Sequence, residues 1–344
     1  MSKKVLVTGG TGYIGSHTVV ELIQQGYEPV IIDNLYNSDI SVLDGIERIT
    51  DKRPAFYQIE MCDLPAMKAF FEIEKDIVAV IHFAAVLIVD ESVSKPHFYY
   101  HNNLVSTLNL LECMKLYHIN KLVFSSSCTV YGNPDTLPVK EDAGIKPAAS
   151  PYGNTKKICE EIIADVCKAS DLDAISLRYF NPIGNHESVQ IGEIPHGVPT
   201  HLVPYITQTA KGIRPFLKVF GSDYSTHDGT CIRDYIHVVD LAEAHISAIK
   251  RLMQMKNNSS YEFFNIGTGK GFSVLDMIKA FERATGINIP YELVDRRAGD
   301  VEAVYADTAK AETALQWKAQ RSVEEMLLSA WKWELKLSQT RALR

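Results

Sequence analysis

The sequence lacks the patterns that mark membrane, secreted and nucleic-acid-binding proteins. It has no Lys/Arg-rich block, and 35 basic against 42 acidic residues give the 344-residue chain a net charge of -7, which disfavours nucleic acid and anionic membranes as partners. The longest apolar run, residues 78–89, is interrupted by His82 and is shorter than the about 20 residues that span a bilayer. A strand-like run begins at the fourth residue, leaving no room for a signal peptide. We therefore expect a cytoplasmic protein.

Cysteines are few and scattered. None of the six is spaced as CxxC, and no histidine cluster accompanies them, so we expect neither a metal site nor a disulfide framework. The remaining composition, with 46% hydrophobic and 22% charged residues, is that of a globular chain with a sizeable core.

In the first half of the chain, short β-branched runs alternate with helical patterns. Helices are expected from the Gly-rich turn to about Gln25 and at residues 103–116 and 152–169, and strands at residues 4–8, 29–33, 56–59, 78–83, 121–125 and 173–178. Such alternation predicts an α/β fold with a Rossmann-like, doubly wound parallel sheet.

After Phe180 the pattern changes. Residues 181–204 are rich in Gly, Pro, His and Asn and show little periodicity, which is typical of loops that form a binding surface. Helical patterns return at residues 237–253, 274–284 and 322–336. We interpret this as a Rossmann domain over residues 1–181 and a smaller mixed α/β substrate domain over 182–344, with a segment near 233–250 returning to the Rossmann domain.

A glycine-rich turn follows the first expected strand. Gly9 allows a tight turn, Gly12 lets the backbone approach a pyrophosphate, and Gly15 lets the following helix pack closely on the sheet. The N-terminus of that helix then faces the phosphates. Asp33 ends the second expected strand, where its carboxylate can accept hydrogen bonds from ribose hydroxyls. Because it would repel a 2′-phosphate and no arginine follows at residues 34–37, NAD is favoured over NADP. The alternative is a purely structural turn.

A second motif carries acid–base chemistry. Tyr152 and Lys156 form YxxxK at the start of an expected helix and share one face of it. A free tyrosine has a pKa of about 10, which a nearby ammonium and a nicotinium ring lower, so that the pair can act as a base near pH 7. Ser127 leaves the carboxyl end of an apolar strand, where ligands bind in such sheets, and can bond the reacting hydroxyl. Chance matching of YxxxK and ordinary strand-end serines are the alternatives.

Seven segments together make a resemblance specific. TGGTGYIGSH, IIDNLYNS, SSSCTVYG, SPYGNTKK, LRYFNPIG, GTCIRDYIHVVDLA and NIGTGKGFSVLDM follow in this order. The chain resembles the UDP-galactose 4-epimerases of the extended short-chain dehydrogenase/reductase family over nearly its whole length. The resemblance implies reversible 4-epimerisation of a UDP-hexose through a 4-keto sugar, with NAD kept tightly bound. It also implies a homodimer through paired helices, for which those at residues 103–116 and 152–169 are the candidates, although core packing explains their apolar faces equally well.

The resemblance also implies the contacts of cofactor and substrate. Cofactor contacts are expected at Gly9, Gly12, Tyr13, Ile14, Gly15, Asp33, Asn34, Asn37, Ser38, Asp63, Leu64, Phe83, Ala84, Ala85, Asn102, Ser125, Tyr152, Lys156 and Tyr179. Substrate contacts are expected at Ser127, Tyr152, Asn181, His201, Leu202, Lys218, Phe220, Arg233, Arg297, Asp300 and Val304. The two arginines also fit on physical grounds, because a pyrophosphate needs bidentate cations. The alternative for them is a surface ion pair with Asp234 or Asp295.

Two positions depart from the family pattern. Leu87 stands where these epimerases carry a lysine beside the cofactor, and His201 stands where they carry an asparagine beside the substrate phosphates; both changes bear on rate and affinity. Val304 stands where some relatives carry a tyrosine that excludes a 2-acetamido group, so we expect UDP-GalNAc and UDP-GlcNAc as further substrates; the alternative is that Val304 merely packs against the domain interface.

Two rival functions remain. A nucleotide-sugar 4,6-dehydratase of the same fold would carry an acidic pair where Cys128 and Thr129 stand, and neither side chain can do that acid–base work. A catalytically weak NAD-binding regulatory protein is the other alternative, supported only by Leu87 and His201.

Overall fold

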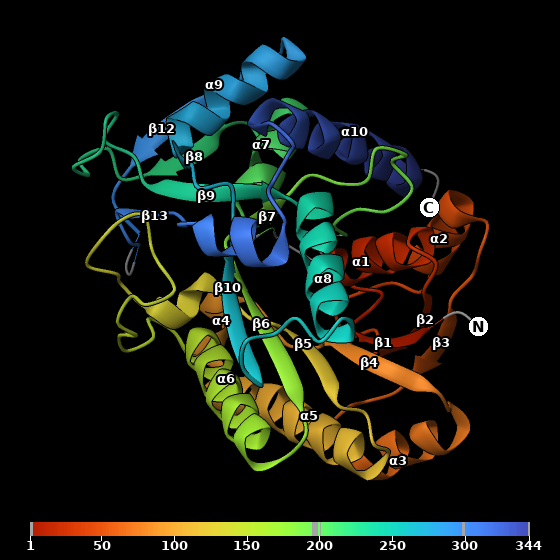
Figure 1. The fold of residues 1–344 in the computed structure, drawn as a ribbon. Coiled ribbons are helices and arrows are strands. Elements are labelled where there is room, and N and C mark those ends of the chain that lie inside the picture. The colour runs from red at the N-terminus through yellow and green to blue at the C-terminus, as the bar shows by residue number, and fades with distance from the viewer. Residues whose placement is uncertain (1–2, 195–198, 200, 298–299, 343–344) are drawn as a thin grey trace.

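The computed structural model describes residues 3–194, 199, 201–297 and 300–342 (Figure 1). Its central layer is a seven-stranded sheet in the order β10-β6-β5-β4-β1-β2-β3, with every neighbouring pair parallel. The strands are β1 Lys4–Thr8, β2 Glu28–Asp33, β3 Ala55–Gln58, β4 Ile77–His82, β5 Lys121–Ser125, β6 Asp173–Tyr179 and β10 Tyr261–Ile266. The chain reverses its direction of strand addition between β1 and β4, which is where ligands bind in sheets of this kind. The predicted fold class is confirmed.

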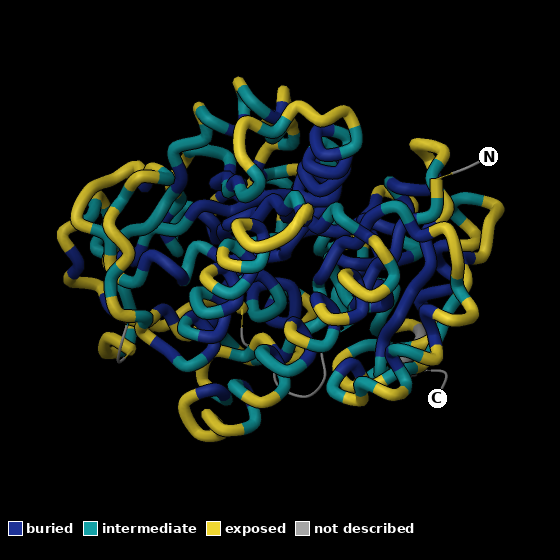
Figure 2. Tube along the Cα trace, turned by 60° about the horizontal axis from the view of Figure 1, so that its bottom comes forward, coloured by how far each residue is buried: buried dark blue, intermediate teal, exposed yellow. Residues whose placement is uncertain are grey.

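Helices cover both faces of this sheet (Figure 1). Alternate residues of β1 divide between the two faces: Val5 and Val7 pack in one core with α1 Tyr13–Gln24, α2 Val42–Thr50 and α8 Val238–Met253, and Leu6 packs in the other with α3 Leu64–Ile73, α5 Pro96–Leu116 and α6 Pro151–Ala169. A strand buried on both sides needs a continuous apolar run. Burial of each such side chain contributes roughly 1.5–3 kcal/mol to the free energy of folding. Figure 2 shows the buried segments through the middle of the molecule.

A second, smaller unit lies beyond the carboxyl ends of these strands. A sheet of order β11-β9-β13 has β7 paired to β9, and β12 pairs with β8. Ile206, Phe281 and Leu327 lie in its core. Its elements are β7 Asn181–Ile183, β8 Leu217–Phe220, β9 Ile232–His237, β11 Gly271–Ser273, β12 Tyr291–Val294, β13 Ala303–Val304, α7 Leu202–Ala210, α9 Val274–Thr285 and α10 Val323–Ala342.

Two segments from the second half of the chain join the central sheet and its helices. Strand β10 pairs with β6 along its whole length, and helix α8 packs against α1. The division of the chain at residue 181 stays a prediction, but its second part clearly contributes both a strand and a helix to the first layer.

Several elements differ from the sequence-based expectation. Helix α5 begins at Pro96 rather than Asn103, because proline is well suited to the first turn of a helix. Helices α2, α3, α7 and α4 Val89–Ser94 were not predicted, and strand β7 lies within the segment expected to be loop. Across the described residues, no helix combines the length and apolarity that a membrane crossing requires.

Candidate active site

The glycine-rich turn joins β1 to α1 in a conformation that only glycines allow. Gly9 has a φ of +68°, and a Cβ at Gly9 would lie 2.8 Å from the amide nitrogen of Ala84. A Cβ at Gly15 would lie 2.2 Å from the carbonyl oxygen of Gly9. Helix α1 starts at Tyr13 and Ile14 behind Gly12, with no side chain capping its N-terminus. Its first amides can therefore bind a phosphate.

Asp33 lies at the carboxyl end of β2 beside this turn. One of its carboxylate oxygens accepts from the amide of Leu35 at 2.9 Å and from the hydroxyl of Ser38 at 3.1 Å, and the other from the amide of Thr11 at 3.2 Å. These bonds orient the carboxylate and leave lone pairs for ribose hydroxyls. The arrangement fits a dinucleotide without a 2′-phosphate.

Of the other residues expected near the adenosine, Asn34 donates to Glu60 at 2.7 Å, and Asn37 is exposed. Asp63 caps the N-terminus of α3 by accepting from the amide of Ala66 at 3.0 Å, so Leu64 begins that helix.

The loop after β4 lies beside the glycine-rich turn, at the carboxyl ends of the strands. The amide of Phe83 donates to the carbonyl of Thr8 at 3.0 Å, and Ala84 and Ala85 follow it. Asn103 fixes the loop by bonding the backbone of Val86 in both directions at 2.9 and 3.0 Å. Asn102, the predicted cofactor contact, donates to Asn103 at 3.1 Å. Leu87 follows in this loop with 42% of its surface exposed.

Ser127, Tyr152 and Lys156 come together at the carboxyl end of β5. Ser127 caps a short 3₁₀ turn through the amide of Thr129 at 3.2 Å, and its hydroxyl lies near enough to Tyr152 to lower the pKa of that phenol. Lys156 donates to the carbonyl oxygen of Ser125 at 2.8 Å, and its ammonium lies 6.0 Å from the centre of the Tyr152 ring. All three predicted catalytic side chains are buried.

Burial governs the ionisation of this group. It raises the pKa of Tyr152 well above the ordinary value, and Tyr179 and Cys128 act in the same direction, whereas the hydrogen bond with Ser127 lowers it. Burial lowers the pKa of Lys156 to about 8, so its ammonium form predominates at neutral pH. The surrounding protein favours the neutral phenol. The expected activation of Tyr152 therefore depends on the Lys156 charge and on a bound cofactor.

Tyr179 extends the site along the neighbouring strand. Its hydroxyl lies 2.8 Å from that of Ser125, and burial raises its pKa to about 12. Ser125 thus bonds Lys156 through its carbonyl and Tyr179 through its side chain, which places these predicted cofactor residues around one strand end.

The two predicted pyrophosphate ligands are held by carboxylates of the protein. Arg233 on β9 lies 3.5 Å from Asp300, and Arg297 bonds Asp90 of α4. The alternative partners considered from the sequence, Asp234 and Asp295, are wrong. Asp234 is turned into the protein, where it accepts from the amides of Thr268, Gly269 and Ala306, and the pair with Asp90 joins segments 207 positions apart.

The remaining predicted substrate residues come from the smaller unit. Asn181 starts β7, Leu202 starts α7, and Lys218 and Phe220 are exposed on β8. Val304 lies on β13 opposite Arg233 and packs beside the cluster of Val130, Tyr131, Val139, Phe180 and Ala306, which Cys128 also contacts. Val304 and Cys128, which directly follows the strand-end serines, thus pack against the same cluster.

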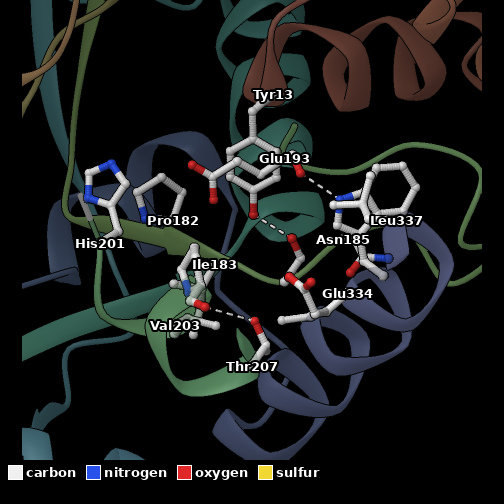
Figure 3. Close-up of a pocket in the computed structure, with 14 residues that line it drawn as sticks. Tyr13, Pro182, Ile183, Asn185, Glu193, His201, Val203, Thr207, Glu334 and Leu337 are labelled. Carbon is white, nitrogen blue, oxygen red and sulfur yellow. Dashed lines mark hydrogen bonds between the residues drawn. The ribbon is translucent and has the colours of Figure 1, made fainter. Parts of the chain in front are cut away.

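His201 precedes α7 and lines a small cavity of about 40 Å³ together with Tyr13 and Glu193 (Figure 3). Burial raises the pKa of Glu193, and the charge of His201 opposes this. The hydroxyl of Tyr13 donates to the carbonyl of Gly184. Tyr13 thus links the start of α1, where the phosphates are expected, to the wall that carries His201.

One group of possible metal ligands lies apart from this site. The side chains of His227, Asp228 and Asp276 have ligand atoms within 4.8 Å of one another. Asp276 accepts from the amide of Ser273 in the capping box of α9, and Asp228 accepts from the hydroxyls of Ser273 and Thr230. These bonds account for both carboxylates as structural groups, and we assign them no metal.

Comparison with known proteins agrees with this geometry. The sequence family described as GDP-mannose 4,6 dehydratase matches residues 6–329. The chain is 49% identical over 331 residues to UDP-glucose 4-epimerase of Bacillus subtilis, with 96% of each chain covered. It is 50% identical to UDP-glucose 4-epimerase 2 of Arabidopsis thaliana, with 97% of this chain and 95% of that one covered.

A solved structure extends the similarity to the fold. UDP-glucose 4-epimerase from Stenotrophomonas maltophila, with bound NAD and formylated UDP-arabinopyranose, is 47% identical and has a TM-score of 0.95 over 98% of this chain and 99% of that one. The identities over nearly complete chains outweigh the dehydratase description of the broader family. The chain belongs to the UDP-glucose 4-epimerase family, within the extended short-chain dehydrogenases/reductases.

Proposed function

We propose that this protein interconverts UDP-galactose and UDP-glucose by oxidising and re-reducing carbon 4 of the sugar, with NAD kept bound between turnovers. The observation that carries the proposal is the buried Ser127–Tyr152–Lys156 group beside the uncapped N-terminus of α1. A base and a phosphate-binding helix end at one sheet edge suit a hydroxyl oxidation next to a dinucleotide. Membership of the 4-epimerase family supports the same reaction.

Tyr152 is the group that takes the proton from the sugar's 4-hydroxyl. Ser127 bonds Tyr152 and can bond the same sugar oxygen, which aligns the proton for transfer. Lys156 contributes its positive charge, which favours the phenolate over the phenol. When bound, NAD⁺ supplies the hydride acceptor for carbon 4 and a second positive charge. Tyr152 returns the proton to the oxygen after the keto sugar has turned its other face.

Rotation of the sugar requires that the UDP stays anchored while the hexose moves. We propose that Arg233 and Arg297 bind the pyrophosphate, because a guanidinium bonds two phosphate oxygens at once. Both arginines lie on segments of the smaller unit, whereas Tyr152 lies on α6, which packs against the seven-stranded sheet. Asn181, Leu202, Lys218, Phe220 and Asp300 complete the proposed UDP site.

The dehydratase alternative is disfavoured by the residues that follow Ser127. Burial raises the pKa of Cys128 to about 12, so its thiol stays protonated and cannot act as a base near neutral pH. Thr129 has no acidic proton in this range. Elimination of water from the sugar needs an acid and a base at these positions.

We propose that Val304 leaves room for a 2-acetamido group, so that UDP-GalNAc and UDP-GlcNAc are also substrates. Its contact with the cluster beside Cys128 supports this position. Burying the acetamido methyl would contribute about 0.8 kcal/mol, which is enough for tolerance but not for strict selection.

We also propose a homodimer that forms through α5 and α6 in the cytoplasm. Leu108 and Leu116 leave 48% and 52% of their surfaces exposed on α5, and paired helices could cover them. Sedimentation of the wild type and Leu108→Glu tests the dimer, and cell fractionation tests the compartment. A monomeric wild type would contradict the dimer.

The test of the proposed function is turnover of UDP-galactose by purified wild type and Tyr152→Phe. We expect the wild type to form UDP-glucose and the variant to lose a factor on the order of 10²–10⁴, since it lacks the proton acceptor. NAD content and melting temperature should be unchanged. A wild type without turnover would favour the NAD-binding regulatory protein, and near-wild-type turnover in the variant would exclude Tyr152 as the base.

A further inference from the structure

A buried carboxylate lies one helical turn beyond the catalytic lysine. Tyr152, Lys156 and Glu160 follow at intervals of four residues on α6 and so share one face of the helix. The side chain of Glu160 is only 6% exposed. Its two oxygens accept from the Nε of Arg178 at 2.9 Å and from the Nη2 at 2.5 Å. A base, a cation and an anion therefore form one row.

Glu160 also bonds the strand end that carries Ser127. The hydroxyl of Ser126 donates to the same carboxylate at 2.6 Å. Arg178 donates in turn to the hydroxyl of Tyr131 at 3.0 Å, within the 3₁₀ turn that Ser127 caps. Glu160 lies on α6 and thus ties this helix to residues 125–131, so that it joins the two segments that supply the catalytic side chains.

The electrostatic surroundings of Lys156 make this carboxylate decisive. Burial lowers the pKa of Lys156 to about 8, and the charges of Cys159 and Glu160 oppose that shift. Burial raises the pKa of the Cys159 thiol, which is neutral at pH 7. Burial and the charge of Lys156 lower the pKa of His82 on β4 to about 3, so His82 is neutral too. Glu160 is the carboxylate among these neighbours, it acts to raise the pKa of Lys156, and Arg178 holds it in place.

We infer that Glu160, held by Arg178, is a positioning residue for the epimerase reaction: it keeps Lys156 protonated and thereby keeps Tyr152 competent as the base. This inference rests on the proposed function, because it concerns the same Tyr152–Lys156 pair. Without the charge of Glu160, Lys156 loses its proton at lower pH. The phenolate of Tyr152 is then less favoured, and Tyr152 ionises at higher pH.

The chain contains a matched control for this inference. Arg251 and Glu262 form a second ion pair with side chains 8% and 7% exposed, against 3% and 6% for Arg178 and Glu160. Arg251 likewise donates twice to Glu262, at 2.7 and 3.0 Å. This pair joins α8 to β10 and is not among the groups that act on Lys156. Loss of either carboxylate disturbs a buried ion pair, but only the loss of Glu160 should change the pH dependence of catalysis.

The experiment compares Glu160→Gln with Glu262→Gln in the NAD-bound enzyme. The pH dependence of turnover is measured on UDP-galactose, and the ionisation of Tyr152 is followed as the ultraviolet tyrosinate signal that Tyr152→Phe removes. We expect Glu160→Gln to move the alkaline loss of activity down by about one pH unit or more and to move the Tyr152 ionisation up. Glu262→Gln should move neither.

A wild-type pH profile and tyrosinate titration in Glu160→Gln would overturn the inference, as would equal shifts in both variants. If Glu160→Gln does not fold, the double change Glu160→Gln with Arg178→Gln removes the buried charge pair as a whole and should give shifts in the same two directions, but smaller ones, because the positive charge of Arg178 leaves together with the carboxylate. Its control is Glu262→Gln with Arg251→Gln. The tyrosinate titration needs no turnover, so it decides on Glu160 even if the wild type does not epimerise UDP-galactose.

Discussion

On the side of the site where the cofactor is proposed to bind, Asp33 is oriented by bonds from Thr11, Leu35 and Ser38, and the amides at the start of α1 have no side-chain cap. On the sugar side, Arg233 and Arg297 are held by Asp300 and Asp90. The first side is arranged for its ligand within one sheet, whereas the second has its cations paired to carboxylates. If Arg233 and Arg297 bind the pyrophosphate as proposed, binding of the nucleotide sugar exchanges these ion pairs, whereas binding of the cofactor at Asp33 and the start of α1 exchanges none.

This difference also fits the two lifetimes that the reaction requires. A cofactor that stays bound through many turnovers benefits from groups that need no rearrangement. A substrate that leaves after each turnover can be released when carboxylates compete for the arginines. The following changes test whether the two sides behave differently.

The largest effect on the sugar side is expected from Arg233→Gln. Loss of a charge-assisted bond to the pyrophosphate should raise the KM for UDP-galactose roughly 10- to 100-fold, with NAD content unchanged. Steady-state kinetics and the absorbance of released cofactor measure the two sides separately. Arg283→Gln, which removes an exposed arginine paired with Glu324 on the surface, is the control. An equal loss of NAD would show that the two sides are not independent.

Val304→Tyr tests whether selectivity belongs to the sugar side alone. The added ring should crowd a 2-acetamido group and lower kcat/KM for UDP-GlcNAc roughly 10-fold or more, while UDP-glucose and NAD binding are nearly unaffected. Side-by-side kinetics on the two sugars provide the measurement. A wild type inactive on the acetylated pair, or equal losses on both sugars in the variant, would contradict the assignment of Val304.

The smallest effect is expected from Asp90→Asn, which frees Arg297. Exposed ion pairs are weak, so the KM for UDP-galactose should fall by up to about five-fold at low salt, and the difference should shrink as ionic strength rises. Titrating KM against salt in both proteins checks this. A higher KM in the variant would mean that Asp90 holds Arg297 in the binding orientation rather than competing for it.

The sequence predicted six of the seven strands of the central sheet and the NAD cofactor, and there is a physical reason for this. The Gly9 turn, the end of β2 at Asp33 and the Tyr152–Lys156 spacing are local patterns, and each carries its geometry within a few residues. Strands β1 and β5 were predicted with the observed bounds, because strands buried on both faces form unbroken apolar runs.

The pairing of distant segments could not be predicted in this way. The partners of Arg233 and Arg297 depend on how β9, β13 and α4 lie in space. Asp234 was wrongly considered as an ion-pair partner because it is adjacent in sequence, whereas its strand turns its side chain into the protein. Glu160 was overlooked for the same reason, since its partner Arg178 comes from β6. The one local signal for Glu160 was its spacing of four residues from Lys156, which marks the shared helix face.

The most direct test of the account follows the hydrogen at carbon 4. If the sugar is oxidised and re-reduced by one bound NAD, UDP-galactose carrying deuterium at carbon 4 should give UDP-glucose that keeps the deuterium there, and the unlabelled substrate in heavy water should take up none. Mass spectrometry and NMR of the product read both results. Loss of the label to solvent, or uptake of deuterium at carbon 4 from heavy water, would contradict hydride transfer and return at this site.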